Sequence, residues 1–128
     1  MRILLVDDDS SVLQALMATL KTMPGHEIRV AANAQKAQEN AAAMGGVDLL
    51  ITDVVMEPTD GFTLQAELKA AYPHLRTIFI SGYDLSDYTE QTSNAHVLAK
   101  PVDFNLLLDS LARVLRRYHE SRWPTNEG

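Results

Sequence analysis

The chain contains 128 residues, no cysteine, and 17 acidic against 11 basic residues, which gives a formal net charge of -6. This length fits a single domain with its own hydrophobic core, and the lack of cysteine excludes disulfides and thiolate metal sites, which favours a cytoplasmic protein. The acidic balance argues against direct contact with nucleic acid, because phosphate backbones attract the opposite charge.

The first element is a short apolar run, Ile3 to Val6, followed by three acids. This run is too short for a signal peptide or a membrane span, so we expect neither. Segments of helical period separate it from four further apolar runs, and this alternation is typical of βα units that build a parallel sheet. We therefore predict an α/β fold, with strands over residues 2–7, 27–31, 48–53, 76–81 and 96–99.

Amphipathic helices are expected between these strands. Apolar residues recur at spacings of three and four over residues 13–20 and 64–72. Residues 34–44 are rich in alanine and predict a helix that packs closely against its neighbours. The clearest pattern is in the last helix, where one face is expected to carry Phe104, Leu107, Leu108, Leu111 and Leu115.

The boundaries of the helices carry their own signals. Asn33 and Asp60 precede helical segments and are suited to be N-caps. Residues 84–94 give the weakest helical signal, because only Leu85 and Tyr88 are large and apolar there. We expect a short, loosely packed helix in this segment, which would be among the first to shift.

Polar side chains stand at the carboxyl ends of four predicted strands. Asp7 and Asp8 follow the first strand, Asp53 ends the third, Ser81 ends the fourth and Lys100 follows the fifth. In an open parallel sheet these ends meet at one edge, where such folds bind their ligands. Three carboxylates, a hydroxyl and an ammonium gathered there would suit a divalent cation beside a phosphoryl group.

The acids have simpler explanations when each is taken alone. Asp7 or Asp9 by itself would more often cap the following helix. Acids that crowd together, however, raise one another's pKa and cost stability unless a cation compensates them. Once Asp53 joins the group, Mg²⁺ is a better explanation than a solvated acidic loop, because Mg²⁺ prefers oxygen ligands and takes one or two carboxylates.

These residues fall within five short motifs, which are Val6-Asp7-Asp8, Asp53 with Met56 after it, Asp60-Gly61, Ser81 and Lys100-Pro101. In this order and spacing the motifs resemble those of the receiver domain of bacterial two-component response regulators. The resemblance extends from about Arg2 to Tyr118. It implies a flavodoxin-like (βα)5 fold, a three-layer sandwich whose five parallel strands have the order 2-1-3-4-5.

The resemblance also implies roles for the site residues. Asp53 would accept a phosphoryl group from the phosphohistidine of a histidine kinase or a phosphotransfer protein. Mg²⁺ would be held by Asp8, Asp53 and the backbone carbonyl of Val55, with Asp7 acting directly or through water. Lys100 and Ser81 would contact the phosphoryl group, and the resemblance implies a cis peptide bond between Lys100 and Pro101.

On this interpretation the chain is no enzyme toward other molecules and catalyses only its own phosphorylation and dephosphorylation. It would change conformation through Ser81 and Lys100 to control an output domain or protein, or pass the phosphoryl group on. A homodimer is compatible with the family. The segment between Ser81 and Lys100 is, however, about one helical turn shorter than is usual, which weakens the expectation of the family's usual dimer.

Three other positions bear on the response to phosphorylation and on the lifetime of the phosphoryl group. Val97 stands where many receivers carry a Tyr or Phe whose side-chain rotamer reports phosphorylation. Tyr83 or Tyr88 would have to take over the role of that missing aromatic residue. Val55 and Tyr83 occupy positions that flank the phosphoryl group in receivers and influence its hydrolysis. Neither side chain carries a carboxylate or amide to orient water, so we hypothesise a persistent acyl phosphate.

Two alternatives remain open from the sequence. A receiver-like interaction module would bind partners without being phosphorylated, although such modules usually lack one of the acids or the lysine. A small phosphohydrolase of the haloacid-dehalogenase type would use Asp7 as nucleophile and Asp9 as general acid and base. That alternative leaves Asp53 without a purpose.

The carboxyl-terminal part is basic, with Arg113, Arg116, Arg117 and Arg122 close together. The simplest interpretation is a cationic last turn that complements the helix dipole.

We predict a receiver domain over residues 1–119 and a tail over residues 120–128 that is a linker or a remnant of cloning. The four histidines show no ligand spacing, and we assign them no function.

Overall fold

The structure, a computed structural model, describes residues 1–122, with side chains up to residue 120. Its five strands are β1 (Arg2–Val6), β2 (Glu27–Ala31), β3 (Leu49–Asp53), β4 (Arg76–Ser81) and β5 (His96–Ala99). The helices between and after them are α1 (Ser10–Leu20), α2 (Ala34–Ala43), α3 (Gly61–Ala71), α4 (Thr89–Thr92) and α5 (Phe104–Arg122). The strands are all parallel in the order β2-β1-β3-β4-β5, which confirms the predicted fold.

The interior strands β1 and β3 are buried on both faces, as expected of parallel strands that helices cover on each side. Every residue of β3 is buried, and in β1 only Arg2 is partly exposed. Because side chains alternate along a strand, Leu4 and Leu50 face one layer of helices, whereas Leu5 and Ile51 face the other.

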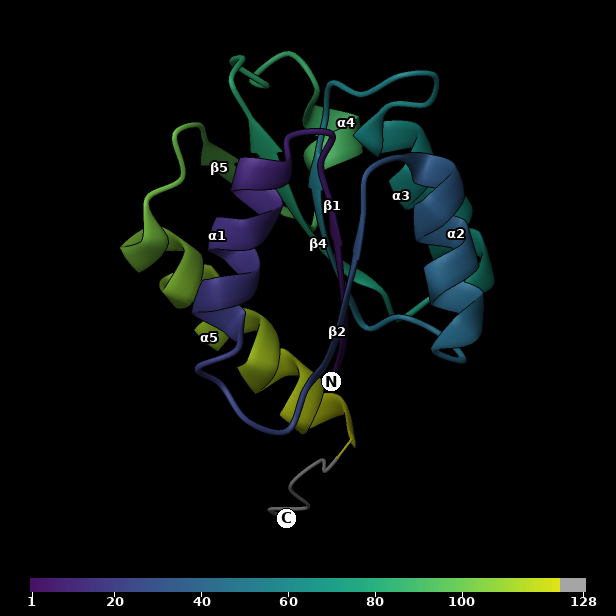
Figure 1. Cartoon of the computed structure of the whole chain (residues 1–128), viewed down its shortest axis with the longest axis vertical. Helices are drawn as coiled ribbons and strands as arrows, with labels where there is room; N and C mark the ends of the chain where they lie inside the picture. Colours follow the sequence, from purple (N-terminus) through teal and green to yellow (C-terminus); the bar gives the residue numbers. More distant parts are fainter. Residues whose placement is uncertain (123–128) are drawn as a thin grey trace.

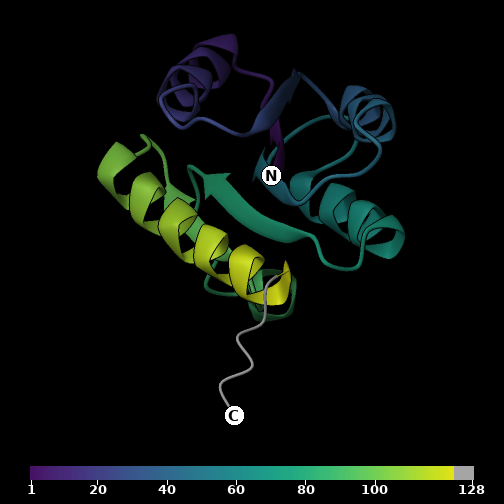
Figure 2. The same ribbon diagram turned by 90° about the horizontal axis from the view of Figure 1, so that it is seen from below.

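The helices form the two outer layers of a three-layer sandwich (Figures 1 and 2). On one face α1 and α5 bury Leu16, Leu20, Leu107 and Leu111 against the sheet. On the other face α2 and α3 pack against the sheet, and the buried residues of α2 are all alanines. Small side chains therefore let α2 approach the sheet closely, as its composition predicted.

The N-caps confirm the predicted helix starts. The side chain of Asn33 accepts a hydrogen bond from the Lys36 N–H at 2.8 Å, and that of Asp60 accepts one from the Thr63 N–H at 2.8 Å. Asp9 caps α1 by accepting from the Ser11 N–H at 2.9 Å. Each bond satisfies a backbone donor that the first turn of a helix leaves without a partner.

The structure corrects one expectation about α5. Its buried face carries Leu107, Leu111 and Val114, while Phe104 and Leu108 are 39% and 41% exposed. The helix continues to Arg122, and the domain boundary at residue 119 stays a prediction. The predicted tail lies mostly outside the described residues.

The predicted short helix between β4 and β5 is present as α4, which has only four residues. None of them is buried, so this element depends on few contacts, in keeping with its weak sequence pattern.

Among residues 1–122, no helix is both long and apolar enough to cross a membrane.

Candidate functional site

The carboxyl ends of the strands bring the predicted site residues together. Val6 pairs with Thr52 across β1 and β3, so Asp7 and Asp53 follow side by side. Asp53 in turn pairs with Ile80 of β4, and Ser81 pairs with Ala99 of β5. The parallel register thus places all the strand-end polar residues along one edge, as the sequence predicted.

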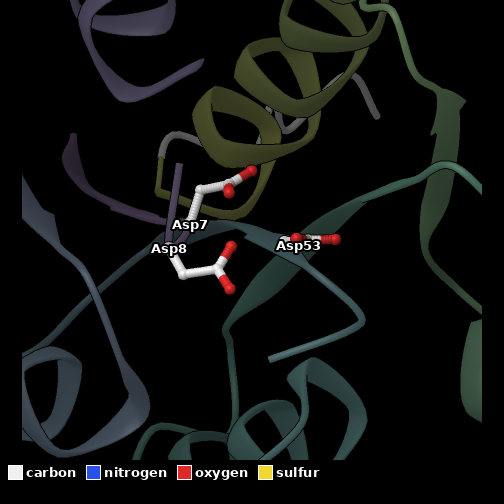
Figure 3. Close-up of side chains that lie close together, drawn as sticks. All are labelled: Asp7, Asp8 and Asp53. Carbon is white, nitrogen blue, oxygen red and sulfur yellow. The ribbon is translucent and has the colours of Figure 1, made fainter. Parts of the chain in front are cut away.

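Three carboxylates meet at this edge (Figure 3). Asp7, Asp8 and Asp53 each offer an oxygen atom that lies within 4.8 Å of the others. Asp7 and Asp53 are buried, with 1% and 6% of their surface exposed, whereas Asp8 is exposed. The group is therefore open to solvent on one side, and a hydrated cation could enter there.

Lys100 provides the positive charge between the two buried acids. Its Nζ lies 3.0 Å from Asp7 Oδ2 and 3.2 Å from Asp53 Oδ2. Only the contact with Asp53 has the geometry of a hydrogen bond, so Asp7 Oδ2 is paired by charge but has no hydrogen-bond donor. An oxygen of this kind can still take a metal or a metal-bound water.

The pKa values of this pair follow from their burial and their contacts. Burial raises the pKa of Asp7, and the Asp9 N–H and Lys100 offset only part of that rise. For Lys100, burial lowers the pKa, but the contacts with Asp7 and Asp53 outweigh it and the pKa is raised overall. The loss of hydration therefore outweighs ion pairing at Asp7, whereas ion pairing outweighs the loss of hydration at Lys100, whose side chain is 25% exposed.

Ser81 is 2% exposed and sits at the end of β4. Its Oγ accepts a hydrogen bond from the Tyr83 N–H at 3.0 Å, and its carbonyl accepts one from the Lys100 N–H at 2.9 Å. A hydroxyl can accept and donate at the same time. The Ser81 proton is therefore available for an oxygen atom at the carboxylate edge.

The loop after β3 borders the site through its backbone. The Val55 N–H donates to Asp53 Oδ1 at 3.4 Å, and the Val55 side chain is 53% exposed. The peptide bond between Lys100 and Pro101 is cis, as the resemblance implied. A second cis bond, between Glu57 and Pro58, was not anticipated.

Sequence reasoning missed two parts of the site. Asp7 Oδ1 accepts a hydrogen bond from the Asp9 N–H at 2.8 Å, which fixes the carboxylate that faces Lys100. This contact could have been found, because aspartate often bonds the backbone two residues on. The direct contact of Lys100 with Asp7 could not, because only the fold brings these two residues together.

The donor set fits a hard cation. Three carboxylates supply oxygen ligands without histidine or cysteine, which suits Mg²⁺ more than Zn²⁺. The adjacent lysine adds a positive charge that a carboxylate or phosphoryl oxygen can contact. The edge can therefore bind a metal and an anionic group next to each other.

The chain is similar to known proteins. The family of the response regulator receiver domain matches residues 3–112. The chain is 34% identical over 115 residues to the response regulator protein FleR of Pseudomonas aeruginosa, covering 88% of this chain and 24% of FleR. It is 29% identical over 117 residues to the response regulator receiver protein CpdR of Brucella abortus, covering 89% of this chain and 96% of CpdR.

A solved structure agrees with these matches. The signal receiver domain of an HD domain-containing protein from Pseudomonas fluorescens Pf-5 superimposes with a TM-score of 0.83 and 30% identity. The alignment covers 97% of this chain and 93% of that domain. The region matched by the family, residues 3–112, includes four strands in full, all of β1 except Arg2, and every residue of the carboxylate edge, so the chain belongs to the response regulator receiver domain family.

Proposed function

We propose that Asp53 is the phosphoacceptor of this receiver domain. One observation carries the proposal: Asp53 shares an edge of the sheet with Asp7 and Asp8, their carboxylate oxygens lie within 4.8 Å, and Lys100 contacts Asp53. Phosphoryl transfer depends on alignment and charge neutralisation more than on covalent help from the protein. This edge offers both around a single carboxylate.

The donor is a phosphohistidine of a histidine kinase or phosphotransfer protein. A carboxylate oxygen of Asp53 attacks phosphorus, the N–P bond breaks, and the imidazole leaves and takes a proton from solvent. Asp8, Asp53 and the Val55 carbonyl would hold Mg²⁺, with Asp7 acting directly or through water, and the ion would neutralise charge on the phosphoryl oxygens. Lys100 contacts another oxygen of the group.

Ser81 converts the modification into a conformational change. Its free hydroxyl proton donates to a phosphoryl oxygen on Asp53, which draws the end of β4 toward the site. The Tyr83 N–H is bonded to the same Oγ, so the segment that leads to α4 moves with it. That segment is held by few contacts, and its new position is what an output domain or protein recognises.

The chain spans about a quarter of FleR and nearly the whole of CpdR. Receiver domains therefore occur in relatives of very different length. We propose that this receiver controls an output domain or protein, or passes the phosphoryl group on, and that it acts enzymatically only on its own phosphorylation.

The test is phosphorylation by acetyl phosphate with Mg²⁺, followed by borohydride trapping and mapping of the modified residue. We expect modification of Asp53 that requires Mg²⁺ and disappears in Asp53→Asn. The matched control is Asp9→Asn, which removes a nearby acid outside the three-carboxylate group and keeps the cap, because Asn caps as well as Asp. It should be modified like the unaltered protein.

Two outcomes would contradict the proposal. Modification of Asp7 with continuous release of phosphate would indicate the haloacid-dehalogenase type of hydrolysis. A protein that binds Mg²⁺ but is not modified by acetyl phosphate or by any phosphohistidine donor would indicate an interaction module. The place of Asp53 inside the three-carboxylate group, which a nucleophilic Asp7 would not need, supports the receiver over the hydrolase.

A further inference from the structure

A groove of about 670 Å³ lies at the end of the molecule opposite to the carboxylate edge. Its walls are the carboxyl-terminal half of α5 and the first residues of β4 and β5. The residues that line it are Arg76, His96, Arg113, Arg116, Arg117 and Glu120. Arg76 and His96 begin their strands, whereas Asp53 and Ser81 end theirs, so the groove is separate from the phosphorylation site.

The charge of this groove is opposite to that of the rest of the protein. Four arginines and one glutamate line it, out of 11 basic and 17 acidic residues in the chain. The remaining sequence therefore holds seven basic and sixteen acidic residues. Such a separation creates a local positive potential that an anionic partner would be steered toward.

The fold does not account for these arginines. In the part of the chain with described side chains, none of the four makes an ion pair, although Arg2 and Arg29 do. The helix-dipole interpretation covers the last turn of a helix only. Because α5 ends at Arg122, Arg113, Arg116 and Arg117 all lie before that turn. The side chain of Arg122 lies outside the described part.

The spacing of the charges indicates the kind of ligand. Arg113 and Arg117 are one helical turn apart, about 6 Å along α5, and Arg76 faces them from β4. Guanidinium groups spread along a groove suit several carboxylates along a chain, each bound by a planar fork of donors. The groove has no large apolar residue in its lining, so it does not suit an apolar helix.

We propose that this basic groove binds an acidic segment of a partner protein, with Arg113 and Arg117 on one side and Arg76 on the other. The site is independent of the phosphorylation chemistry. Its location on β4, β5 and α5 nevertheless places the partner on the same strands that end in Ser81 and precede Lys100.

His96 offers a direct measure of binding. Burial lowers its pKa, and the charges of Arg113 and Arg117 lower it further, which places this ring within the field of the groove. Carboxylates bound beside those arginines would offset their charge. The pKa of His96 should therefore rise when the groove is filled.

The experiment is an NMR titration of the protein with a polyglutamate peptide of about ten residues. We expect saturable shifts at Arg76, His96 and residues 113–120, a rise in the His96 pKa, and loss of binding in about 0.5 M salt, because the Debye length is then only a few ångströms. The variant Arg113→Glu/Arg117→Glu should bind at least about tenfold more weakly, since two charge pairs become repulsive.

The matched control is Lys21→Glu/Lys69→Glu, which changes the net charge equally at two exposed lysines outside the groove and should bind like the unaltered protein. Circular dichroism and modification of Asp53 by acetyl phosphate verify that each variant folds. Absence of shifts in the groove would overturn the proposal. Tighter binding of pyrophosphate than of the peptide at the same residues would overturn the proposal and indicate a polyphosphate site. Dimerisation through this face, detected by sedimentation, would overturn it and indicate that a second copy of the chain binds there.

Discussion

Gly61 packs directly against the backbone of Asp53. A Cβ atom on Gly61 would overlap the carbonyl oxygen of Asp53 and lie 3.1 Å from the Cα of Val54. The Gly61 N–H also donates to the Val54 carbonyl at 2.8 Å, which fixes the start of α3 against the end of β3. The glycine is needed because a backbone neighbour cannot rotate away.

We therefore expect Gly61→Ala to lower the free energy of unfolding by about 1–3 kcal/mol, the usual cost of overpacking. Displacement of Asp53 should also slow its modification by acetyl phosphate. Urea denaturation measures the first effect. Gly82→Ala is the control, because nothing lies within 4 Å of a Cβ at that position. Equal stability of the two variants would show that the β3–α3 connection is not tightly packed.

Removal of the charge on Lys100 should destabilise the metal-free protein. Lys100→Met leaves Asp7 and Asp53 buried without a cation, and we expect a loss of about 1–2 kcal/mol because the lysine is partly exposed. Mg²⁺ should recover more stability in this variant than in the unaltered protein, since the ion replaces the missing charge.

Thermal and urea denaturation with and without Mg²⁺ check this result. Lys36→Met is the matched control, because Lys36 pairs with Glu39 at 3.4 Å on the exposed face of α2. Such surface pairs contribute less than about 1 kcal/mol. If the two variants lost the same stability and responded equally to Mg²⁺, the role of Lys100 as counter-charge would be refuted.

Asp7 should titrate at a higher pH in the folded protein than in the unfolded chain. Burial raises its pKa above the ordinary 3.8. The folded state therefore holds this proton more tightly, so the contribution of Asp7 to stability falls as the pH rises from 3.8 through the folded pKa.

A titration of the Asp7 carboxyl carbon by NMR gives the midpoint directly. In metal-free protein we expect it above 3.8, and Mg²⁺ should lower it, because a nearby cation favours the charged carboxylate. A midpoint at or below 3.8 without metal would mean that Lys100 and the Asp9 N–H outweigh burial.

Tyr88 is placed to report movement of the β4–α4 segment. Its ring centroid lies 5.2 Å from that of Phe62, which in turn lies 5.0 Å from Phe79 in the core. Tyr83 is 70% exposed and Val97 offers no ring. Of the two tyrosines that the sequence offered as substitutes for the missing aromatic, only Tyr88 packs against α3.

Fluorotyrosine NMR should therefore show a larger change for Tyr88 than for Tyr83 when Asp53 is modified by acetyl phosphate. Tyr88→Ala should also reduce stability by about 0.5–1.5 kcal/mol, the range for an aromatic pair. An unchanged chemical shift of Tyr88 in fully modified protein would mean that the segment between β4 and α4 does not move with Ser81.

The strands and the carboxylate edge were predictable because they depend on local sequence. Continuous apolar runs such as Leu49 to Ile51 predict buried parallel strands, and the pairing register of those strands then places the polar residue that follows each run. The caps at Asn33 and Asp60 were predictable for the same reason. They depend on hydrogen bonds to residues three positions away.

The remaining features depend on contacts between distant segments. The exposure of Phe104 and Leu108 follows from how α5 lies on α1 and the sheet, since helical spacing alone also allows a wider apolar face. The basic groove requires Arg76 and His96 to approach α5 from two strands. Arg76 and His96 lie far from Arg113 in the sequence, and the pattern of arginines alone is typical of the last turn of a helix.

The rim of the proposed phosphorylation site predicts a persistent acyl phosphate. Val55 and Tyr83 approach the site through their backbone N–H groups, which bond Asp53 Oδ1 and Ser81 Oγ. Their side chains are 53% and 70% exposed, and neither carries a carboxylate or an amide. No side chain at these two positions is therefore suited to orient an attacking water.

We expect the acyl phosphate of the purified protein to last well beyond seconds. Val55→Glu and Tyr83→Asn, each of which adds a group that can orient water, should shorten that lifetime by about tenfold, which is less than the roughly 10²- to 10⁴-fold effect of a fully positioned general base. Val55→Ala, which removes an exposed side chain without adding a polar group, should leave it unchanged. Decay of modified protein, followed after removal of acetyl phosphate, measures each lifetime. A lifetime of seconds in the unaltered protein, or equal lifetimes in all four proteins, would show that residues elsewhere govern hydrolysis.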